Sequence, residues 1–401
     1  MSTSILYHAY NLKGVHYKAT SYEGNSLVFA AEMTGEHIKC PKCKKREFIY
    51  KGSKTRRFNM SPIGRKRCFL DLGRHRCKCN QCGTIWWPHL PFMIGKHRYI
   101  RSFALTVLDL LKSMTILATA EYLGVGWDLV KEIHKAKLKA LYRQIPLKKV
   151  KHIGIDEFSI QKGHKYMTVV SDLESGRILH AVEGRSKDDI KPFLKKLAKK
   201  AYKLEAVAMD MSGSYYSAVS EFLPQVDIVF DHYHITALMN RAIDDFRRKL
   251  QNEYEKADQK TLKGSRFLLL KNYVSLDEKK KSRLDSLLRV NEPLFLIHSM
   301  KEQLRLFWEH DNKKDARDFL DIWIRDAIKS KIPALAKVAR TLAGYRTGLL
   351  NYYKHFITSG AVEGLNNKIK TMKRQAYGFR DKEYFRLRLY HLHTQRYSLT
   401  G

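Results

Sequence analysis

Apolar residues between positions 149 and 240 follow strand and helix patterns in turn. Segments that alternate apolar and polar residues, or are continuously apolar, predict five strands at 151–160, 165–173, 177–184, 205–211 and 226–235. Helical periodicity predicts two helices, which precede the fourth and the fifth strand. Three strands, a helix, a strand, a helix and a strand is the element order of an RNase H-like mixed sheet. Residues 149–240 are therefore predicted to form the first part of such an α/β core.

The pattern changes on both sides of this core. Residues 1–93 combine short β-type stretches with turn-rich segments and predict a small β module, and residues 94–148 predict a helix-turn-helix. Strand signals stop after residue 240, so residues 241–357 are predicted to be an all-α insertion. Residues 358–401 return to an amphipathic helix, the final helix of the core, followed by a C-terminal tail.

Charge narrows the class of partner. The 401 residues include 75 Lys and Arg against 40 Asp and Glu, a formal net charge of +35, while 44% of the residues are hydrophobic. Such a chain can bury several cores and still attract a polyanion, which favours double-stranded DNA over a small substrate. A generic basic protein or a ribosome-associated protein is the alternative. No apolar run is long enough to span a membrane, so a cytoplasmic, nucleoid-associated protein is expected.

Two aspartates are candidate catalytic and metal-binding residues. Asp156 lies in the first predicted strand, beside Ile155, and Asp210 follows the apolar run that forms the fourth. An isolated carboxylate there costs free energy, whereas carboxylates that converge from separate elements can hold Mg²⁺ or Mn²⁺. Either aspartate could instead cap a turn or pair with a lysine. Glu157, next to Asp156, should point to the opposite face of the sheet.

Glu363 is the third candidate acid. It lies beside an apolar helical face made by Val362, Leu365, Ile369, Met372 and Ala376. Asn367, Lys370, Lys373 and Arg374 follow on the same helix and are candidate DNA-binding residues. A helix packed on the sheet could therefore aim one carboxylate at the other two and a basic stripe at DNA. The alternative is a glutamate favoured in the first turn by the helix dipole.

The six cysteines all fall between Cys40 and Cys82, too close together to crosslink a chain of this length. Two C-x-x-C pairs, Cys40 with Cys43 and Cys79 with Cys82, are typical of a tetrahedral Zn²⁺ site, so the β module is predicted to be zinc-ribbon-like with one structural ion. Cys77 could replace Cys79 as the fourth ligand. Buried, reduced thiols are the alternative.

His234 is a possible accessory residue. It follows Asp231 and His232 at the expected end of the fifth strand, where α/β sheets commonly meet their ligands. From there it could approach a metal site or a phosphate. A hydrogen-bonded structural histidine is the alternative.

Several long segments resemble one family, the ISL-three bacterial insertion-sequence transposases. They are CPKC with CKCNQCG, GIDEFSIQKGHKYMTVVSDLESGRIL, VAMDMSGSYYSAV, FDHYHITALMN and SGAVEGLNNKIKTMKRQAYGFRDKEYFRLR. The resemblance implies a zinc-binding module, a helix-turn-helix and an RNase H-like catalytic domain with a helical insertion before the last acid. It also carries the DDE catalytic triad onto Asp156, Asp210 and Glu363.

These observations together predict a DNA transposase. Two Mg²⁺ or Mn²⁺ ions held by the triad would support cleavage and strand transfer at the element's terminal inverted repeats, into target DNA. Joining two ends calls for a homo-oligomer, at least a dimer. Two alternatives stay open: a DNA-binding regulator derived from a transposase, and an RNase H-like nuclease that cuts without strand transfer.

Overall fold

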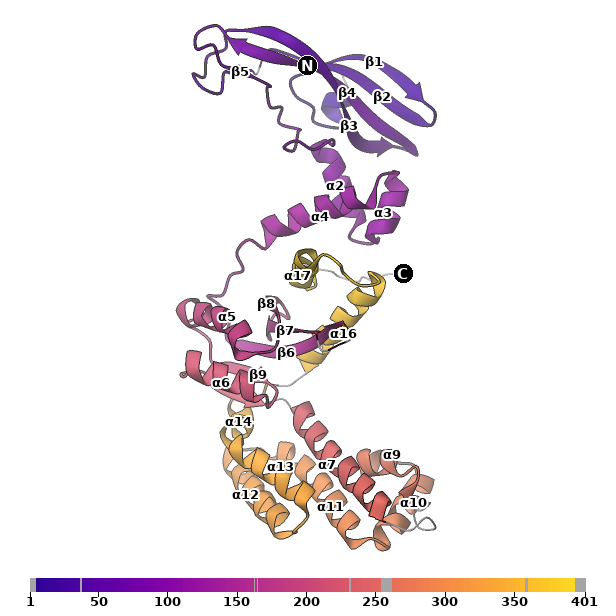
Figure 1. The fold of residues 1–401 in the computed structure, drawn as a ribbon, viewed down its shortest axis with the longest axis vertical. Helices are drawn as coiled ribbons and strands as arrows, with labels where there is room; N and C mark the ends of the chain where they lie inside the picture. The colour runs from indigo at the N-terminus through magenta and orange to yellow at the C-terminus, as the bar shows by residue number, and fades with distance from the viewer. Residues whose placement is uncertain are drawn as a thin grey trace. The chain divides into compact units, whose positions relative to one another are not determined.

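The computed structural model describes residues 5–36, 38–161, 163, 165–230, 232–253, 262–357 and 360–393. These residues form two compact units, which divide between Arg143 and Gln144. The boundary falls close to the predicted end of the helix-turn-helix. Each unit is described by itself below (Figure 1).

The N-terminal unit is built on a mixed five-stranded sheet. After a short helix α1 (Ile5–His8) come strands β1 (Val15–Glu23), β2 (Ser26–Met33), β3 (Phe48–Ile63), β4 (Lys66–Cys79) and β5 (Ile85–Trp86). Four strands follow the order β1-β2-β4-β3, and β5 pairs with β4. The pairings are antiparallel except for that of β2 with β4, which is parallel.

The β3–β4 hairpin is longer than the short strands that the sequence predicted. The half of the hairpin next to its turn buries Phe58 opposite Leu70 and Met60 opposite Cys68, as an amphipathic hairpin does. The half of the hairpin far from the turn is rich in exposed Lys and Arg, so the sequence has no apolar alternation there that would predict a strand. Ladder hydrogen bonds, continued from the buried half, hold that part of the strands.

Three helices complete this unit: α2 (Arg101–Leu110), α3 (Ile116–Leu123) and α4 (Trp127–Leu141). Thr115 caps α3, and Gly124 ends it in the left-handed conformation, so the predicted short helix, glycine turn and longer basic helix are observed. Phe103 and Val107 of α2 belong to the same buried cluster as Phe58. Sheet and helices therefore share one hydrophobic core.

The C-terminal unit contains the second mixed sheet. Its strands are β6 (His152–Gln161), β7 (Lys165–Asp172), β8 (Ile178–Glu183), β9 (Ala206–Met209) and β10 (Asp227–Phe230), in the order β10-β9-β6-β7-β8. β6, β7 and β8 are antiparallel neighbours, whereas β9 is parallel to β6 and β10 to β9. Helices α5 (Lys187–Lys200) and α6 (Gly213–Phe222) lie in the chain between these last strands, as predicted.

Alternation along β6 separates its two faces. Ile153 and Ile155 belong to the buried cluster that also contains Phe193 of α5 and Tyr215 of α6. Phe158 extends to the other face, where its ring lies edge-on to Phe385 of α17 (Lys382–His391) with ring centroids 6.1 Å apart. The central strand is thus covered on both faces, and residues of even number point toward the C-terminal helices.

The fifth strand is shorter than predicted. β10 ends at Phe230, and α7 (His232–Glu253) begins at His232, so Ile235 is a buried helical residue rather than the end of a strand. The apolar run continued through the boundary because both the strand and the first turns of α7 have a buried face. Asp231 lies outside the described residues.

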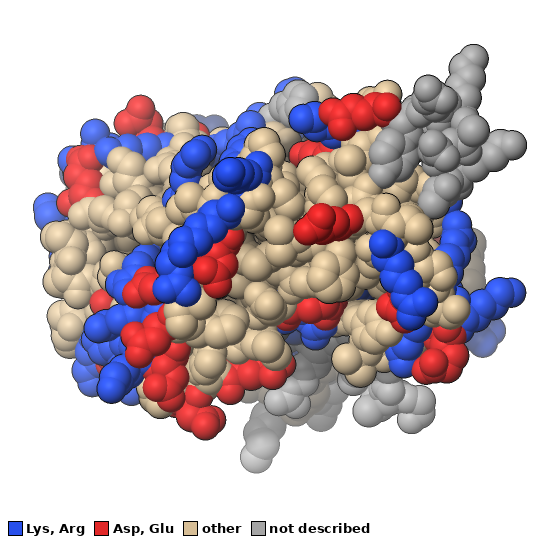
Figure 2. All heavy atoms as spheres, turned by 90° about the horizontal axis from the view of Figure 1, so that it is seen from below, with Lys and Arg blue, Asp and Glu red and all other residues tan. Residues whose placement is uncertain are grey.

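The described regular elements of residues 232–357 are all helices, joined by short loops, in agreement with the all-α insertion predicted for 241–357. After α7 come α9 (Arg266–Leu270), α10 (Glu278–Arg289), α11 (Glu292–Leu306), α12 (Lys313–Lys329), α13 (Pro333–Gly344), α14 (Arg346–Leu350) and α15 (Tyr352–His355), with single 3-10 turns at Tyr273–Ser275 and Phe307–Glu309. Figure 2 views this helical region from below and shows Lys and Arg interspersed with Asp and Glu. None of the described helices combines the length and the apolar character of a membrane span.

Candidate carboxylate and cysteine sites

Asp156 and Asp210 lie at matching positions on neighbouring parallel strands. The register pairs His152 with Ala206 and Gly154 with Ala208. Two residues further along each chain stand Asp156, still in β6, and Asp210, directly after β9. Both aspartates are half-buried at the carboxyl end of this strand pair. The pair predicted from sequence is therefore brought together by the sheet.

The carboxylate of Asp156 is held from two sides. Its Oδ1 accepts a hydrogen bond from the Glu157 amide at 2.7 Å, and its Oδ2 accepts one from the side-chain amide of Asn366. Asn366 lies on α16 (Gly360–Gln375), 210 positions away in the chain. Sequence reasoning missed this residue, although it stands one helical turn after Glu363 and so shares its face.

Asp210 begins the turn that leads into α6. Its Oδ1 accepts a hydrogen bond from the Ser212 amide at 3.2 Å. Tyr215, on the first turns of α6, has a hydroxyl whose pKa is raised by burial and, beyond that, by the negative charges of Glu157 and Asp210. This carboxyl edge of the sheet is therefore a region of concentrated negative charge, as a cation site requires.

Glu157 points to the opposite face, as the alternation of the strand predicted. Its Oε2 lies 3.3 Å from the Tyr215 hydroxyl, which also lies 2.7 Å from Thr168 Oγ1. Its other oxygen lies 3.7 Å from an Arg185 guanidinium nitrogen. Glu157 thus belongs to a hydrogen-bonded network on the α6 side of the sheet.

Glu363 is exposed on the first turn of α16. Among the described residues, it does not join Asp156 and Asp210 in a group whose ligand atoms all lie within 4.8 Å of one another. The structure therefore places two candidate acids side by side and the third on the helix that contacts the first of them. Asn366 makes that contact.

The buried face of α16 is largely the predicted one. Leu365, Ile369 and Met372 are buried, while the side chain of Val362 lies outside those described. Ala376 was wrongly assigned to this face: the helix ends at Gln375, and Ala376 is exposed because the chain leaves the helical repeat there.

The predicted DNA-binding residues on α16 divide into two groups. Asn367, Lys370 and Arg374 are exposed. Lys373 instead donates to the backbone carbonyls of Ser159 and Ile160 at 2.6 and 3.1 Å, and its burial lowers the pKa of its ammonium group. Lys373 thus links α16 to the end of β6, and its ammonium group points to the sheet rather than to solvent.

His234 lies in the first turn of α7 and is half-buried. Its ring lies edge-on to that of Tyr233, with centroids 5.5 Å apart. The role of His234 at a metal site or a phosphate stays a prediction.

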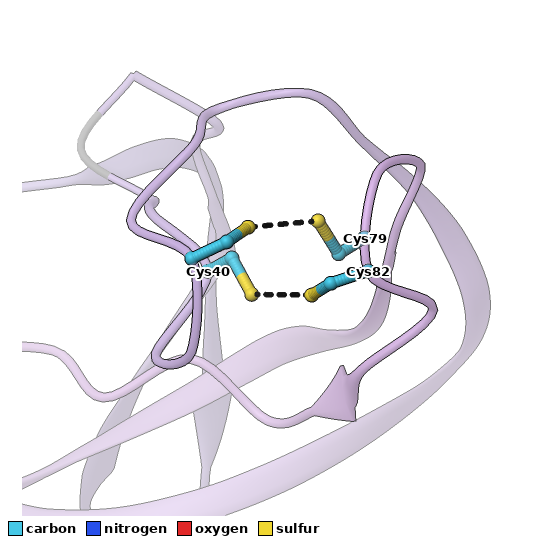
Figure 3. Close-up of side chains that lie close together, drawn as sticks. Cys40, Cys79 and Cys82 are labelled. Atoms are coloured by element: carbon cyan, nitrogen blue, oxygen red, sulfur yellow. Dashed lines mark hydrogen bonds between the residues drawn. The ribbon is translucent and has the colours of Figure 1, made fainter.

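The four predicted zinc ligands meet in the N-terminal unit. Sulfur atoms of Cys40, Cys43, Cys79 and Cys82 all lie within 4.8 Å of one another. Figure 3 labels three of these residues, Cys40, Cys79 and Cys82. The sulfurs of Cys40 and Cys82 are 3.5 Å apart, as are those of Cys43 and Cys79. A tetrahedron with Zn–S bonds of ~2.3 Å has edges of ~3.8 Å, so this group can hold a zinc ion with little adjustment.

The two cysteine turns have the same backbone hydrogen bonds. In the first, the Lys44 amide donates to the Cys40 carbonyl, and the Cys40 amide donates to the carbonyl of Lys45. In the second, Gly83 and Thr84 take the same places around Cys79. Lys44 and Gly83 both adopt positive φ, at 63° and 68°. Each turn thus presents its two thiols in the same way, which is what a shared ion needs.

Cys77, the alternative fourth ligand, lies outside this group. It is fully buried in β4, opposite Tyr50 and Trp86, and burial raises the pKa of its thiol to about 11. The structure therefore favours Cys79.

Basic residues concentrate around the same turns and hairpin. Residues 39–79 contain fifteen Lys and Arg but only two acids, Glu47 and Asp71. A cleft of about 530 Å³ lies between the hairpin tip and α3, and its lining includes Arg65, Arg67 and Tyr122. A positively charged cleft beside a helix-turn-helix is suited to a phosphate backbone.

Comparison with known proteins identifies relatives along most of the chain. A family model described as Transposase, for DDE transposases of the ISL-three type, matches residues 153–389. The transposase for insertion sequence element IS1001 of Bordetella parapertussis is 34% identical over 370 residues, 91% of each chain. The transposase for IS1557 of Mycobacterium tuberculosis is 26% identical, over 86% of this chain and 83% of its own.

Among solved structures, a chain of the Drosophila P element transposase strand transfer complex is similar with a TM-score of 0.33 and 11% identity. The match covers 74% of this chain and 92% of that one. A TM-score at this level carries no argument about fold.

Proposed function

Since this chain belongs to the ISL-three family of DDE transposases and is a DNA transposase, we propose that Asp156, Asp210 and Glu363 form the catalytic triad of its DNA cleavage and strand transfer. The observation that carries this proposal is the position of Asp156 and Asp210, each two residues beyond the last pair, Gly154 with Ala208, at the same end of β6 and β9. The family implies the use of divalent metal ions. The three acids offer the oxygen ligands that Mg²⁺ and Mn²⁺ prefer.

The arrangement of the C-terminal unit supports an RNase H-like core. Three antiparallel strands lead into two parallel ones, in the order β10-β9-β6-β7-β8. β6 is the central strand and is parallel to its neighbour β9. The carboxyl ends of these two strands, where Asp156 and Asp210 stand, therefore lie at the same edge of the sheet. In this proposal α7–α15 are an insertion between the last strand and the helix that carries the third acid.

Two divalent ions bound at this site would activate the attacking oxygen and stabilise the leaving one. Asp156 and Asp210 would hold the metal from the ends of neighbouring strands, and α16, which contacts Asp156 through Asn366, would supply Glu363.

The surrounding groups position the acids. The Ser212 amide fixes one oxygen of Asp210, while Asn366 directs one oxygen of Asp156 toward α16. Lys373 anchors α16 to the end of β6. These contacts limit the rotation of the carboxylates before DNA arrives, which lowers the reorganisation needed for reaction.

We assign recognition of the terminal inverted repeats to the N-terminal unit. Its proposed Zn²⁺ ion would fix the cysteine turns, its hairpin carries the concentrated basic charge, and its second helix-turn-helix element, α4, would enter the major groove. Residues 232–357 carry 26 Lys and Arg against 16 Asp and Glu, a more balanced surface (Figure 2). Asn367, Lys370 and Arg374 would contact DNA near the acids, and joining two ends would require at least a dimer.

The test is Mg²⁺-dependent cleavage of a plasmid that carries the ends of the element. Asp156→Asn, Asp210→Asn and Glu363→Gln variants should bind the ends with unchanged affinity but cleave at least ~10²-fold more slowly, since several kcal/mol of transition-state stabilisation are lost. Glu157→Gln is the matched control, a neighbouring acid on the other face, and should cleave within a few-fold of the parent.

Triad variants that cleave as fast as the parent would refute the assignment. Product analysis adds a second criterion. Joining of the cut ends to target DNA is expected, whereas cut ends without joined product would indicate a nuclease.

A further inference from the structure

A second group of metal-ligating side chains lies at the opposite end of the same strands. His152 begins β6, Glu205 directly precedes β9, and His355 ends α15. One ligand atom from each of the three lies within 4.8 Å of the others. The amino ends of parallel strands therefore carry their own cluster, apart from the acids at the carboxyl ends.

The buried histidine nitrogen of this cluster is the observation that points to a ligand. Within the described chain, His152 Nε2 is shielded from solvent and has no hydrogen-bond partner. The nearest carboxylate oxygen, from Glu205, is 3.7 Å away, too far for a hydrogen bond. A metal with bonds of ~2.1 Å separates two tetrahedral ligands by ~3.4 Å, so a cation fits between these atoms with a small shift.

The other histidine is already oriented. His355 Nε2 lies 2.8 Å from Asp227 Oδ2, and the same oxygen accepts from Lys354 at 2.7 Å. Only 5% of the His355 side chain is exposed. Metal-binding histidines commonly have a carboxylate on the second ring nitrogen, which fixes the ring orientation. Asp227 supplies such a partner.

The backbone around the cluster is fixed. The Lys151 carbonyl accepts from the Glu205 amide at 2.8 Å, and the Glu205 carbonyl accepts from the Asp227 amide at 3.0 Å. The starts of three adjacent strands are thus linked, and the side chains that meet there need little ordering to bind. A preorganised site has a lower entropic cost of binding.

Charge is matched to a divalent ion. Three carboxylates, Glu174, Glu205 and Asp227, face the two histidines, and Lys354 is the ammonium that pairs with Asp227. The sum of these four charges is −2.

We propose that His152, Glu205 and His355 form a binding site for a divalent transition-metal ion, for which Zn²⁺ is the natural probe. Two imidazoles and one carboxylate favour Zn²⁺, Co²⁺ or Ni²⁺ over Mg²⁺.

Such an ion would join the end of the helical region to the sheet. His355 belongs to the last helix before α16, the helix that bears Glu363 and Asn366. Holding α15 against the starts of β6 and β9 fixes the point from which the chain returns to the carboxylate edge. The proposal concerns metal binding and does not depend on the role of the acids.

The experiment is equilibrium dialysis of the full chain against micromolar Zn²⁺, with bound metal counted per chain. Glu205→Gln should bind one zinc ion fewer than the parent, and His355→Gln should show the same loss. Glu221→Gln is the matched control: it removes an acid of α6 that pairs with Lys187, outside both the ligand group and its surrounding charges, and should keep the parent stoichiometry at saturating zinc.

Glu205 is exposed, so its variant is expected to fold, and circular dichroism checks this. Parent-like zinc content in a folded Glu205→Gln would overturn the proposal. Cys82→Ser should remove the zinc ion of the cysteine turns alone. The double variant Cys82→Ser, Glu205→Gln should then bind one zinc ion fewer than Cys82→Ser.

Discussion

In the N-terminal unit, four thiols stand on two short turns with matched backbone hydrogen bonds, and their sulfurs already form a compact group. In the C-terminal unit, two acids stand on adjacent strands, and the third lies on a helix far along the chain. In the function proposed above, a zinc ion would complete the first unit, whose apolar core is the smaller of the two. The second unit has a large apolar core of its own. The cysteines would therefore serve folding, whereas the three acids would serve chemistry.

The largest expected effect tests the first half of this contrast. Replacing Cys43 and Cys82 by serine should remove the zinc ion of the cysteine turns and unfold the N-terminal unit, because structural zinc sites contribute on the order of 10 kcal/mol. Zinc content and limited proteolysis measure the two losses. Cys77→Ala is the control and should retain zinc; loss of zinc there, with retention in Cys79→Ala, would reverse the ligand assignment.

The stability of the C-terminal unit should depend on pH through a buried histidine. Burial lowers the pKa of His180, which stacks on Phe193, to about 4. The unfolded chain takes up this proton near pH 6.5 and the folded chain only near pH 4, so stability falls as the pH decreases between these values. The full effect is about 3 kcal/mol at most. Urea unfolding of the parent and of His180→Phe across pH 4 to 7 should show a flatter profile for the variant; parallel profiles would contradict this.

Asn366 separates positioning from DNA contact. Asn366→Ala frees one oxygen of Asp156, and loss of such a supporting hydrogen bond costs ~10- to 100-fold in metal affinity or activity. Cleavage should therefore slow by that factor, with a higher Mg²⁺ requirement and unchanged DNA affinity. The adjacent Asn367→Ala is the matched control, since its exposed side chain should affect DNA affinity instead. Equal effects of the two variants would remove the distinction.

The smallest effect tests the second half of the contrast. Asp210→Asn keeps an acceptor for the Ser212 amide and removes one of the neighbouring negative charges. Without added Mg²⁺ it should melt at the parent temperature or slightly above it, a gain of about 1 kcal/mol or less. Mg²⁺ should stabilise the parent but not the variant in thermal melts. A marked loss of stability in Asp210→Asn would show that the acid is needed for folding.

The sequence predicted what depends on local periodicity. Alternation located the five strands of the C-terminal sheet, and C-x-x-C spacing located the four thiols. The element order predicted the kind of sheet, but the register that places Asp156 and Asp210 at the same end of β6 and β9 is seen only in the structure. The end of β10 was misjudged, because an apolar run looks the same in a buried strand and in the buried face of a helix.

Contacts between distant segments could not be predicted. The His152, Glu205 and His355 cluster joins positions up to 203 apart, with no motif at any of them. The part of the β3–β4 hairpin far from its turn has no apolar alternation that would predict strands. The strands form there nevertheless, because their cross-strand hydrogen bonds do not depend on which side chains face solvent. Sequence reasoning also chose Asn367 over Asn366, since only the packing of α16 on β6 shows which amide reaches the sheet.

The contact between Asp156 and Asn366 sets an order of events during protein synthesis. At ~5 to 20 residues per second, a ribosome needs about 10 to 40 s to add the 210 residues between them. The N-terminal unit can fold during that interval, whereas the carboxylate edge still lacks α16. In the function proposed above, a nascent chain would thus bind DNA ends before it could cut them, and translation itself would delay cleavage until α16 has been synthesised.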